Sequence, residues 1–346
     1  MESNSYIFSS KKALITLAIF VIVVIAMSMI TDKLMTHFDS NSNIGRSISD
    51  NEQVYRDYDF LAIGDSRTQQ GVDSAMLSNL LSSDEKVADV YNLGRPGMQA
   101  PFTYFIVRDY LDNVDKRPSA IVVNFSFYLL GGEEWMKSIY LTYYKPKLWQ
   151  VIDAYSSQLV TFREALEWYF GTRLSFLRYR DRAPNLVTEL SNPKELARQV
   201  SSISENNERL FRASNFGYLS RGTETITKDE VVIGGYSKGL ERGYSLYFVY
   251  MSRFFEIAAQ NKINVIVYDF PWPQEFMLDP SFSDIHAYYK NLIMNQAKNN
   301  EYVHFPEYDF FWEEKYFSDQ LHLNQSGSEK LTKQLSTWIE EFGMTN

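Results

Sequence analysis

The sequence predicts an α/β fold with a mainly parallel, five-stranded sheet, an N-terminal transmembrane helix and a large helical insertion. Three observations predict it. Short apolar segments alternate with segments of helical spacing in two stretches, 58–126 and 244–346. An uncharged apolar run lies near the N-terminus. Residues 127–243, between the two stretches, lack the alternation and are rich in aromatic side chains.

The N-terminal run extends from Ala13 to Ile30 without a charge and is long enough to span a membrane. Lys11 and Lys12 precede it, so the positive-inside rule predicts a cytoplasmic N-terminus and an exported body. A cleaved signal peptide is the alternative, because Ala26-Met27-Ser28 offers small residues at a cleavage site. The expected segments are a tail at 1–12, an anchor at 13–31 and a polar tether at 32–57.

The first α/β stretch begins with an apolar strand at Asp59–Ile63, which ends in a Gly-Asp-Ser turn. The pattern then predicts a helix at Val72–Leu81, a strand at Val87–Leu93, a helix at Phe102–Val114 and a strand at Ala120–Phe125. Alternating strands and helices of this kind favour a parallel sheet with helices on both faces.

The second stretch resumes the same alternation. It predicts a helix at Ser245–Asn261, a strand at Val265–Tyr268, a helix at Ser283–Lys298, a weak strand at Tyr302–Phe305 and a last helix that ends near Phe342. The aromatic side chains of the 127–243 insertion form either its own small core or a surface that rests on a membrane or a partner. Its arginines, Arg173, Arg178, Arg180 and Arg182, face phosphates or belong to a charged loop.

Composition excludes several classes of function. The chain of 346 residues carries a net charge of −9, which disfavours a nucleic-acid partner. It has no cysteine, so disulfides, thiol catalysis and cysteine-bound metals are excluded. Its four histidines are scattered along the sequence. We therefore expect neither a metal nor a cofactor.

Two motifs supply the three side chains of a Ser-His-Asp triad. Ser66 follows the first strand, at the sheet edge where open α/β folds place their active sites. Asp319 and His322 lie three residues apart before the last helix, so the carboxylate can fix the imidazole tautomer. The sequence predicts Ser66 as nucleophile, His322 as general base and Asp319 as its orienting partner. The alternative for Ser66 is a serine that caps the next helix.

Acyl transfer also needs donors for an oxyanion. The candidates are the Ser66 N–H and an N–H of the turn Gly94–Gly97, where glycine lets the backbone approach a substrate. A plain tight turn is the alternative for that segment. Arg67 could meet an anionic group of the substrate or be solvated like most exposed arginines.

These motifs resemble the SGNH (GDSL) hydrolase superfamily: Gly64-Asp65-Ser66, Asn92-Leu93-Gly94 and Asp319-x-x-His322. The resemblance covers both α/β stretches and leaves out the insertion. It implies a flavodoxin-like three-layer α/β/α sandwich, a triad of Ser66, His322 and Asp319, and an oxyanion donor at Gly94.

Two features depart from the family pattern. The spacing from Ser66 to Gly71 is one residue longer than in typical secreted esterases of the family. The third block, Gly-x-Asn-Asp, is replaced by Val123-Asn124-Phe125-Ser126. Asn124 or Ser126 is the expected substitute for the missing side-chain donor.

The anchor, the insertion and these departures resemble one branch of the family, the membrane-anchored proteins of bacterial envelope polysaccharide O-acylation and lipoteichoic-acid D-alanylation. That branch implies an extracytoplasmic acyltransferase or esterase acting on acetyl or similar esters of an envelope polysaccharide or a teichoic-acid-like polymer. A membrane-bound O-acyltransferase is the expected partner. The alternative is a non-catalytic scaffold or glycan-binding module of the same machinery.

Overall fold

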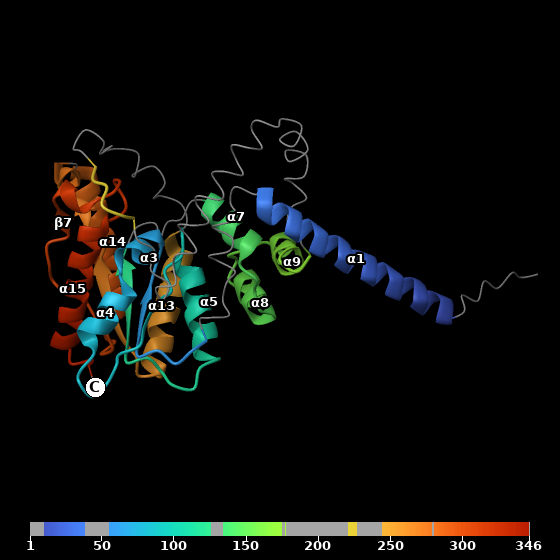
Figure 1. Ribbon diagram of the computed structural model, residues 1–346, viewed down its shortest axis with the longest axis horizontal. Coiled ribbons are helices and arrows are strands. Elements are labelled where there is room, and N and C mark those ends of the chain that lie inside the picture. The colour runs from blue at the N-terminus through green and yellow to red at the C-terminus, as the bar shows by residue number, and fades with distance from the viewer. Residues whose placement is uncertain are drawn as a thin grey trace, which may run out of the picture. The chain divides into compact units, whose positions relative to one another are not determined.

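A five-stranded sheet lies at the centre of the second of two units into which the chain divides (Figure 1). The computed structural model describes residues 10–38, 55–125, 134–174, 177, 221–226, 244–278 and 280–345. The first unit takes residues 1–46 and 141–206, and the second takes 47–140 and 207–346. The short stretch 221–226, which lies within the expected insertion, therefore belongs with the α/β elements.

The sheet is parallel throughout and has the order β2-β1-β3-β4-β6. Its strands are β1 (Phe60–Ile63), β2 (Val90–Asn92), β3 (Ala120–Phe125), β4 (Asn264–Asp269) and β6 (Val303–His304). The predicted mixed α/β fold with a five-stranded parallel sheet is confirmed. Strand β4 pairs with β3 over its whole length, so the two stretches of the sequence form one sheet across the insertion.

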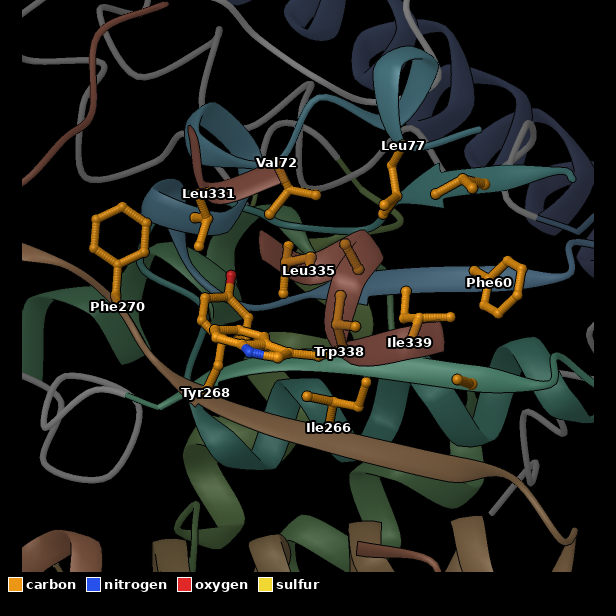
Figure 2. Close-up of a cluster of buried hydrophobic side chains, with 14 of the residues drawn as sticks. Phe60, Val72, Leu77, Ile266, Tyr268, Phe270, Leu331, Leu335, Trp338 and Ile339 are labelled. Atoms are coloured by element: carbon orange, nitrogen blue, oxygen red, sulfur yellow. The ribbon is translucent and has the colours of Figure 1, made fainter. Parts of the chain in front are cut away.

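The strands are apolar because the sheet is covered on both faces. All four residues of β1 are buried, which fits a continuous apolar run rather than an alternating one. On one face, Phe60 and Ile266 of the sheet belong to the same core cluster as Leu335 and Trp338 of α15 (Gln325–Glu341) (Figure 2). Side chains alternate along a strand, so Leu61 is turned to the opposite face.

The helices of this unit lie close to their predicted positions. They are α4 (Ser74–Leu81), α5 (Ala100–Leu111), α13 (Tyr244–Gln260), α14 (Pro280–Ala297) and α15. Helix α15 packs against α4 and against a short helix, α3 (Ser66–Gly71), which the sequence analysis did not predict. Helix α13 packs against α5 and α14.

A second, two-stranded sheet follows β4. It pairs β5 (Trp272–Pro273) with β7 (Phe311–Trp312), next to the 3-10 helices η2 (Gln274–Leu278) and η3 (Glu314–Tyr316). Strand β7 and η3 lead directly into the Asp319–His322 loop.

The first unit contains α1 (Ser10–Phe38), α8 (Leu148–Ser156) and α9 (Phe162–Gly171); α7 (Glu134–Tyr143) spans the boundary between the units. Within α1, the stretch Ala13–Thr31 is long and apolar enough to cross a membrane. Within the expected insertion, the described stretch 134–174 is thus mainly helical. Arg178, Arg180 and Arg182 lie outside the described residues.

Candidate active site

Ser66 lies at the carboxyl end of β1 as the first residue of α3. The preceding Asp65 caps this helix, because its Oδ1 accepts a hydrogen bond of 3.0 Å from the Arg67 N–H. Gly64 turns the chain with φ +154°, and a Cβ there would lie 1.7 Å from Asn124 Oδ1. Only glycine fits this turn, which sets Ser66 at the sheet edge.

The loop that carries His322 is closed on itself. Phe317 and Leu323 form an antiparallel bridge, and the Ser318 N–H donates to the His322 carbonyl at 2.9 Å. Asp319 Oδ1 accepts the N–H groups of Leu321 and His322 at 2.8 and 3.0 Å. These backbone hydrogen bonds hold the Asp319 carboxylate in place independently of its contact with the His322 ring.

The two motifs meet with the geometry of a catalytic triad. Ser66 Oγ lies 2.9 Å from His322 Nε2, and His322 Nδ1 lies 2.9 Å from both oxygens of Asp319. With the proton on Nδ1 donated to the carboxylate, Nε2 is left to accept the serine proton. The three residues predicted from the two motifs therefore lie within hydrogen-bond distance of one another, in the order Ser66, His322, Asp319.

Asp319 remains ionised in this setting. Burial works to raise its pKa, but the hydrogen bond and the charge of His322, the Leu321 N–H and Arg221 outweigh it and lower the pKa to about 2. The side chain of Asp319 is 40% exposed and that of His322 is 14% exposed. A carboxylate at this position is an acceptor at every pH at which the protein is expected to work.

Arg221 is a member of the site that the sequence analysis missed. Its Nη1 donates to Asp319 Oδ2 at 3.0 Å, its Nε donates to Gln70 Oε1 of α3, and its Nη2 lies 3.2 Å from His322 Nδ1. Arg221 is 98 residues from Asp319 in the sequence and follows no motif. No local signal in the sequence pointed to it.

The stretch 221–226 that carries Arg221 is held against the histidine loop by backbone bonds. The Gln325 N–H donates to the Gly222 carbonyl at 2.7 Å, and the Ile226 N–H donates to the Phe317 carbonyl at 3.1 Å. Asn324 Nδ2 also donates to the Glu224 carbonyl at 3.2 Å. These bonds fix the arginine relative to Asp319.

Arg67, which the sequence predicted as either a contact for an anionic substrate group or a solvated side chain, is buried. Its side chain is 3% exposed, and its Nη2 pairs with Asp65 Oδ2 at 2.8 Å. The guanidinium also lies over the rings of Phe270 and Trp272, at 5.3 and 5.1 Å from their centroids. Burial works to raise the pKa of Asp65, but the charge and hydrogen bonds of Arg67 lower it. The pair fixes the turn below Ser66.

The Asn92-Leu93-Gly94 block supports α3. Asn92 Nδ2 donates to the carbonyls of Thr68 and Val72, each at 2.8 Å, so it ties the end of this helix to β2. Asn92 Oδ1 accepts the Gly94 N–H at 2.9 Å. The N–H that was expected to bind an oxyanion already has an acceptor in this structure. A Cβ at Gly94 would lie 2.4 Å from the Gln69 nitrogen, so glycine is needed for packing.

Asn124 and Ser126 were the expected substitutes for the side-chain donor that the third block lacks. Asn124 is fully buried at the end of β3, and its Nδ2 donates to Asp65 Oδ1 at 3.2 Å. Its amide therefore supports the Gly-Asp-Ser turn from below. Ser126 lies outside the described residues.

His286 and His304 have partners other than Ser66, Asp319 and His322. His286 Nε2 is 2.9 Å from Asp269 Oδ1 and its ring stacks on Phe310. His304 stacks on Phe342. Among the described residues, no group of His, Asp and Glu side chains is arranged to hold a metal ion.

Comparison with models of protein families and with curated proteins gives no match to this chain.

Proposed function

We propose that this chain is an extracytoplasmic serine acyltransferase or esterase of the SGNH type. One observation carries the proposal: Ser66 Oγ lies 2.9 Å from His322 Nε2, while Asp319 accepts from the opposite ring nitrogen at 2.9 Å. This arrangement suits the activation of a serine hydroxyl that is a poor nucleophile on its own.

In the proposed reaction, Ser66 Oγ attacks the carbonyl carbon of an acyl ester and His322 takes the hydroxyl proton. The tetrahedral intermediate collapses when His322 returns that proton to the departing alcohol oxygen, which leaves an acyl-serine. Water or a sugar hydroxyl then attacks the acyl carbon with the help of His322, and Ser66 is released. Asp319 stabilises the imidazolium formed in each half-reaction. The Ser66 N–H is the proposed oxyanion donor.

The sheet supports a flavodoxin-like three-layer α/β/α sandwich for the catalytic unit. The observed order β2-β1-β3-β4-β6 corresponds to 2-1-3-4-5 when the strands are numbered within the sheet, which is the flavodoxin order. Ser66 follows the carboxyl end of β1, which pairs with the central strand β3, at the edge where ligands bind in such sheets.

The N-terminal helix and the family resemblance support a proposed location and substrate class. We propose that α1 anchors the chain in a bacterial membrane, with Lys11 and Lys12 on the cytoplasmic side and the triad outside. The proposed substrates are acetyl or similar esters of an envelope polysaccharide or teichoic-acid-like polymer, handled beside a membrane-bound O-acyltransferase.

Turnover of an aryl acetate ester tests the chemistry without knowledge of the natural polymer. The full chain in detergent is expected to release the aryl alcohol, and Ser66→Ala is expected to lose at least about 100-fold of that rate. Ser283→Ala, on the exposed side of α14, is the matched serine control and should retain full turnover. Equal turnover by Ser66→Ala and the unmodified chain would reject the proposal.

A second function is favoured by the donors around Ser66. The Gly94 N–H is bonded to Asn92, and Asn124 is buried against Asp65, so two expected oxyanion donors are engaged elsewhere. This favours a scaffold that binds glycan or holds the acylation machinery in place. A scaffold predicts that Ser66→Ala restores polymer acylation in a deletion strain as well as the unmodified chain does; an enzyme predicts that it does not.

A further inference from the structure

The hairpin of α8 and α9 is apolar on two opposite sides. Its inner side is buried and includes Val151 and Ala154 of α8 and Ala165 and Trp168 of α9. The Trp168 indole N–H donates to the Tyr144 carbonyl at 2.8 Å, which fixes the hairpin at its base. These contacts account for the folding of the hairpin and leave its outer side unexplained.

The outer side of the hairpin carries six large apolar side chains that are between 43% and 62% exposed. These residues are Leu148, Ile152, Tyr155, Phe162, Leu166 and Phe170. We call this set the outer face. The three on each helix follow the spacing of one helical side, and the rings of Tyr155 and Phe162 meet edge to face with centroids 5.9 Å apart. The contact joins the two rows into one continuous apolar surface.

A surface of this kind is unusual on a protein that faces only water. Single exposed apolar residues are common, but a contiguous patch on two adjacent helices marks a contact with a membrane or another protein. In-plane membrane helices show the same pattern, with aromatic and aliphatic side chains on one side and polar residues around them.

We propose that the outer face lies in the headgroup–acyl boundary of the lipid bilayer that α1 enters. This inference rests on the proposed membrane anchor and is independent of any catalytic role for Ser66. The first support is that the α8–α9 hairpin belongs to the same unit as α1, which contains the membrane-length apolar stretch. A bilayer is therefore the apolar phase within reach of that unit.

Charge is the second support. Residues 141–174 contain four basic and three acidic side chains, although the whole chain carries a net charge of −9. Lys145 and Lys147 are exposed at the start of α8. The Arg163 side chain at the start of α9 is 83% exposed and pairs with Glu167 at 2.8 Å, so the two lysines carry this argument. Basic residues beside an apolar helical surface favour anionic lipid headgroups.

The absence of cysteine from the chain allows a direct depth measurement. Single cysteines are introduced into the full chain at Ile152, Leu166, Ile22 and Val87 and labelled with an environment-sensitive nitrobenzoxadiazole dye. Each protein is reconstituted into phosphatidylcholine–phosphatidylglycerol vesicles, with and without doxyl-labelled phosphatidylcholine as a quencher. Ile22 in α1 reports insertion of the anchor, and Val87 in the second unit is an apolar side chain that is 71% exposed.

The proposal predicts doxyl quenching at Ile152→Cys and Leu166→Cys of at least roughly half that at Ile22→Cys, since an in-plane helix sits about 5–10 Å deep. Val87→Cys should not be quenched. Quenching at Ile22→Cys without quenching at the two hairpin positions would overturn the proposal while leaving the anchor intact. No quenching at any position would overturn the anchor and the proposal together.

The same experiment would also recognise other occupants of the outer face. A second copy, a protein partner or another part of this chain on the outer face would shift the dye emission to the blue without doxyl quenching, and that result would also overturn the proposal. Equal quenching at Val87→Cys would indicate general adsorption to lipid and would reject a dedicated membrane face.

Discussion

Arg221 Nη1 lies 3.0 Å from Asp319 Oδ2, on the carboxylate oxygen that receives no backbone bond from the Leu321 or His322 N–H. The same guanidinium reaches Gln70 on α3, the helix that begins with Ser66. One side chain therefore connects the segment that carries the proposed nucleophile with the loop that carries the proposed base. It also brings a permanent positive charge to 3.2 Å from His322 Nδ1.

The charge of Arg221 predicts an effect on the Asp319 carboxyl group. The guanidinium is one of the causes that lower the pKa of Asp319. Arg221→Gln removes that charge and retains a hydrogen-bonding side chain. We expect the pKa of Asp319 to rise toward its usual value in this variant, measured by NMR titration of the carboxyl carbon.

Arg221→Lys separates charge from geometry. It retains the positive charge and loses the planar fork that meets two partners at once. We expect the pKa of Asp319 in Arg221→Lys to stay near that of the unmodified chain. An equal rise of this pKa in both variants would show that the planar fork of Arg221 matters and that its charge does not.

The geometry at Gly64 leads us to expect a large loss of stability even when the residue is replaced by alanine. Its φ of +154° is unfavourable for other residues, and a Cβ would lie 1.7 Å from Asn124 Oδ1 and 2.3 Å from Thr68 Oγ1. We expect Gly64→Ala to lower the free energy of unfolding by at least about 2–3 kcal/mol in urea denaturation.

Gly171→Ala is the matched control for this substitution. It ends α9, and a Cβ there meets nothing within 4 Å. Helix propensity predicts a change between zero and a gain of about 1 kcal/mol. A Gly64→Ala chain as stable as Gly171→Ala would show that the Gly-Asp-Ser turn is not fixed as described.

The carboxyl group of Asp269, at the end of β4, is expected to make the free energy of unfolding sensitive to acid. Burial works to raise its pKa, but His286 at 2.9 Å and Lys290 at 3.0 Å lower it below the usual value of 3.8. A carboxyl group with a lowered pKa in the folded state stabilises the protein above pH 3.8, and this contribution is lost as the pH falls.

The variant Asp269→Asn removes the charge while it retains the shape of the side chain. We expect it to cost about 2 kcal/mol of unfolding free energy near neutral pH, because two buried or half-buried partners lose a charged acceptor. Urea denaturation near pH 3 should show a clearly smaller difference between the two proteins. A difference that is the same at both pH values would exclude titration of Asp269 as its cause.

Much of the sheet could be predicted because its strands are apolar runs buried on both faces, as β1 shows. The proximity of Ser66, His322 and Asp319 could be predicted because each of the two motifs lies next to a recognisable element. Helix α3 was missed for a physical reason: Arg67, Thr68, Gln69 and Gln70 are polar yet buried, so they give no apolar periodicity. Their burial depends on partners elsewhere in the chain.

The hydrogen bond of the Gly94 N–H and the position of Arg221 were not predicted, for different reasons. The Gly94 N–H is engaged by Asn92 two residues earlier, a local Asn turn that the spacing could have suggested. Arg221 is positioned by long-range backbone bonds between the stretch 221–226 and residues around His322, which no periodicity records. Arg67 was predicted from its charge alone, and its burial against Asp65 depends on the tertiary fold.

Activation of Ser66 by His322 underlies the proposed function. It is tested by treating the full chain in detergent with a fluorophosphonate probe and measuring intact mass, beside Ser66→Ala and His322→Ala. We expect one adduct, mapped to Ser66 by peptide analysis and absent from both variants. A folded, unmodified chain that forms no adduct, or an adduct that persists in Ser66→Ala, would contradict it.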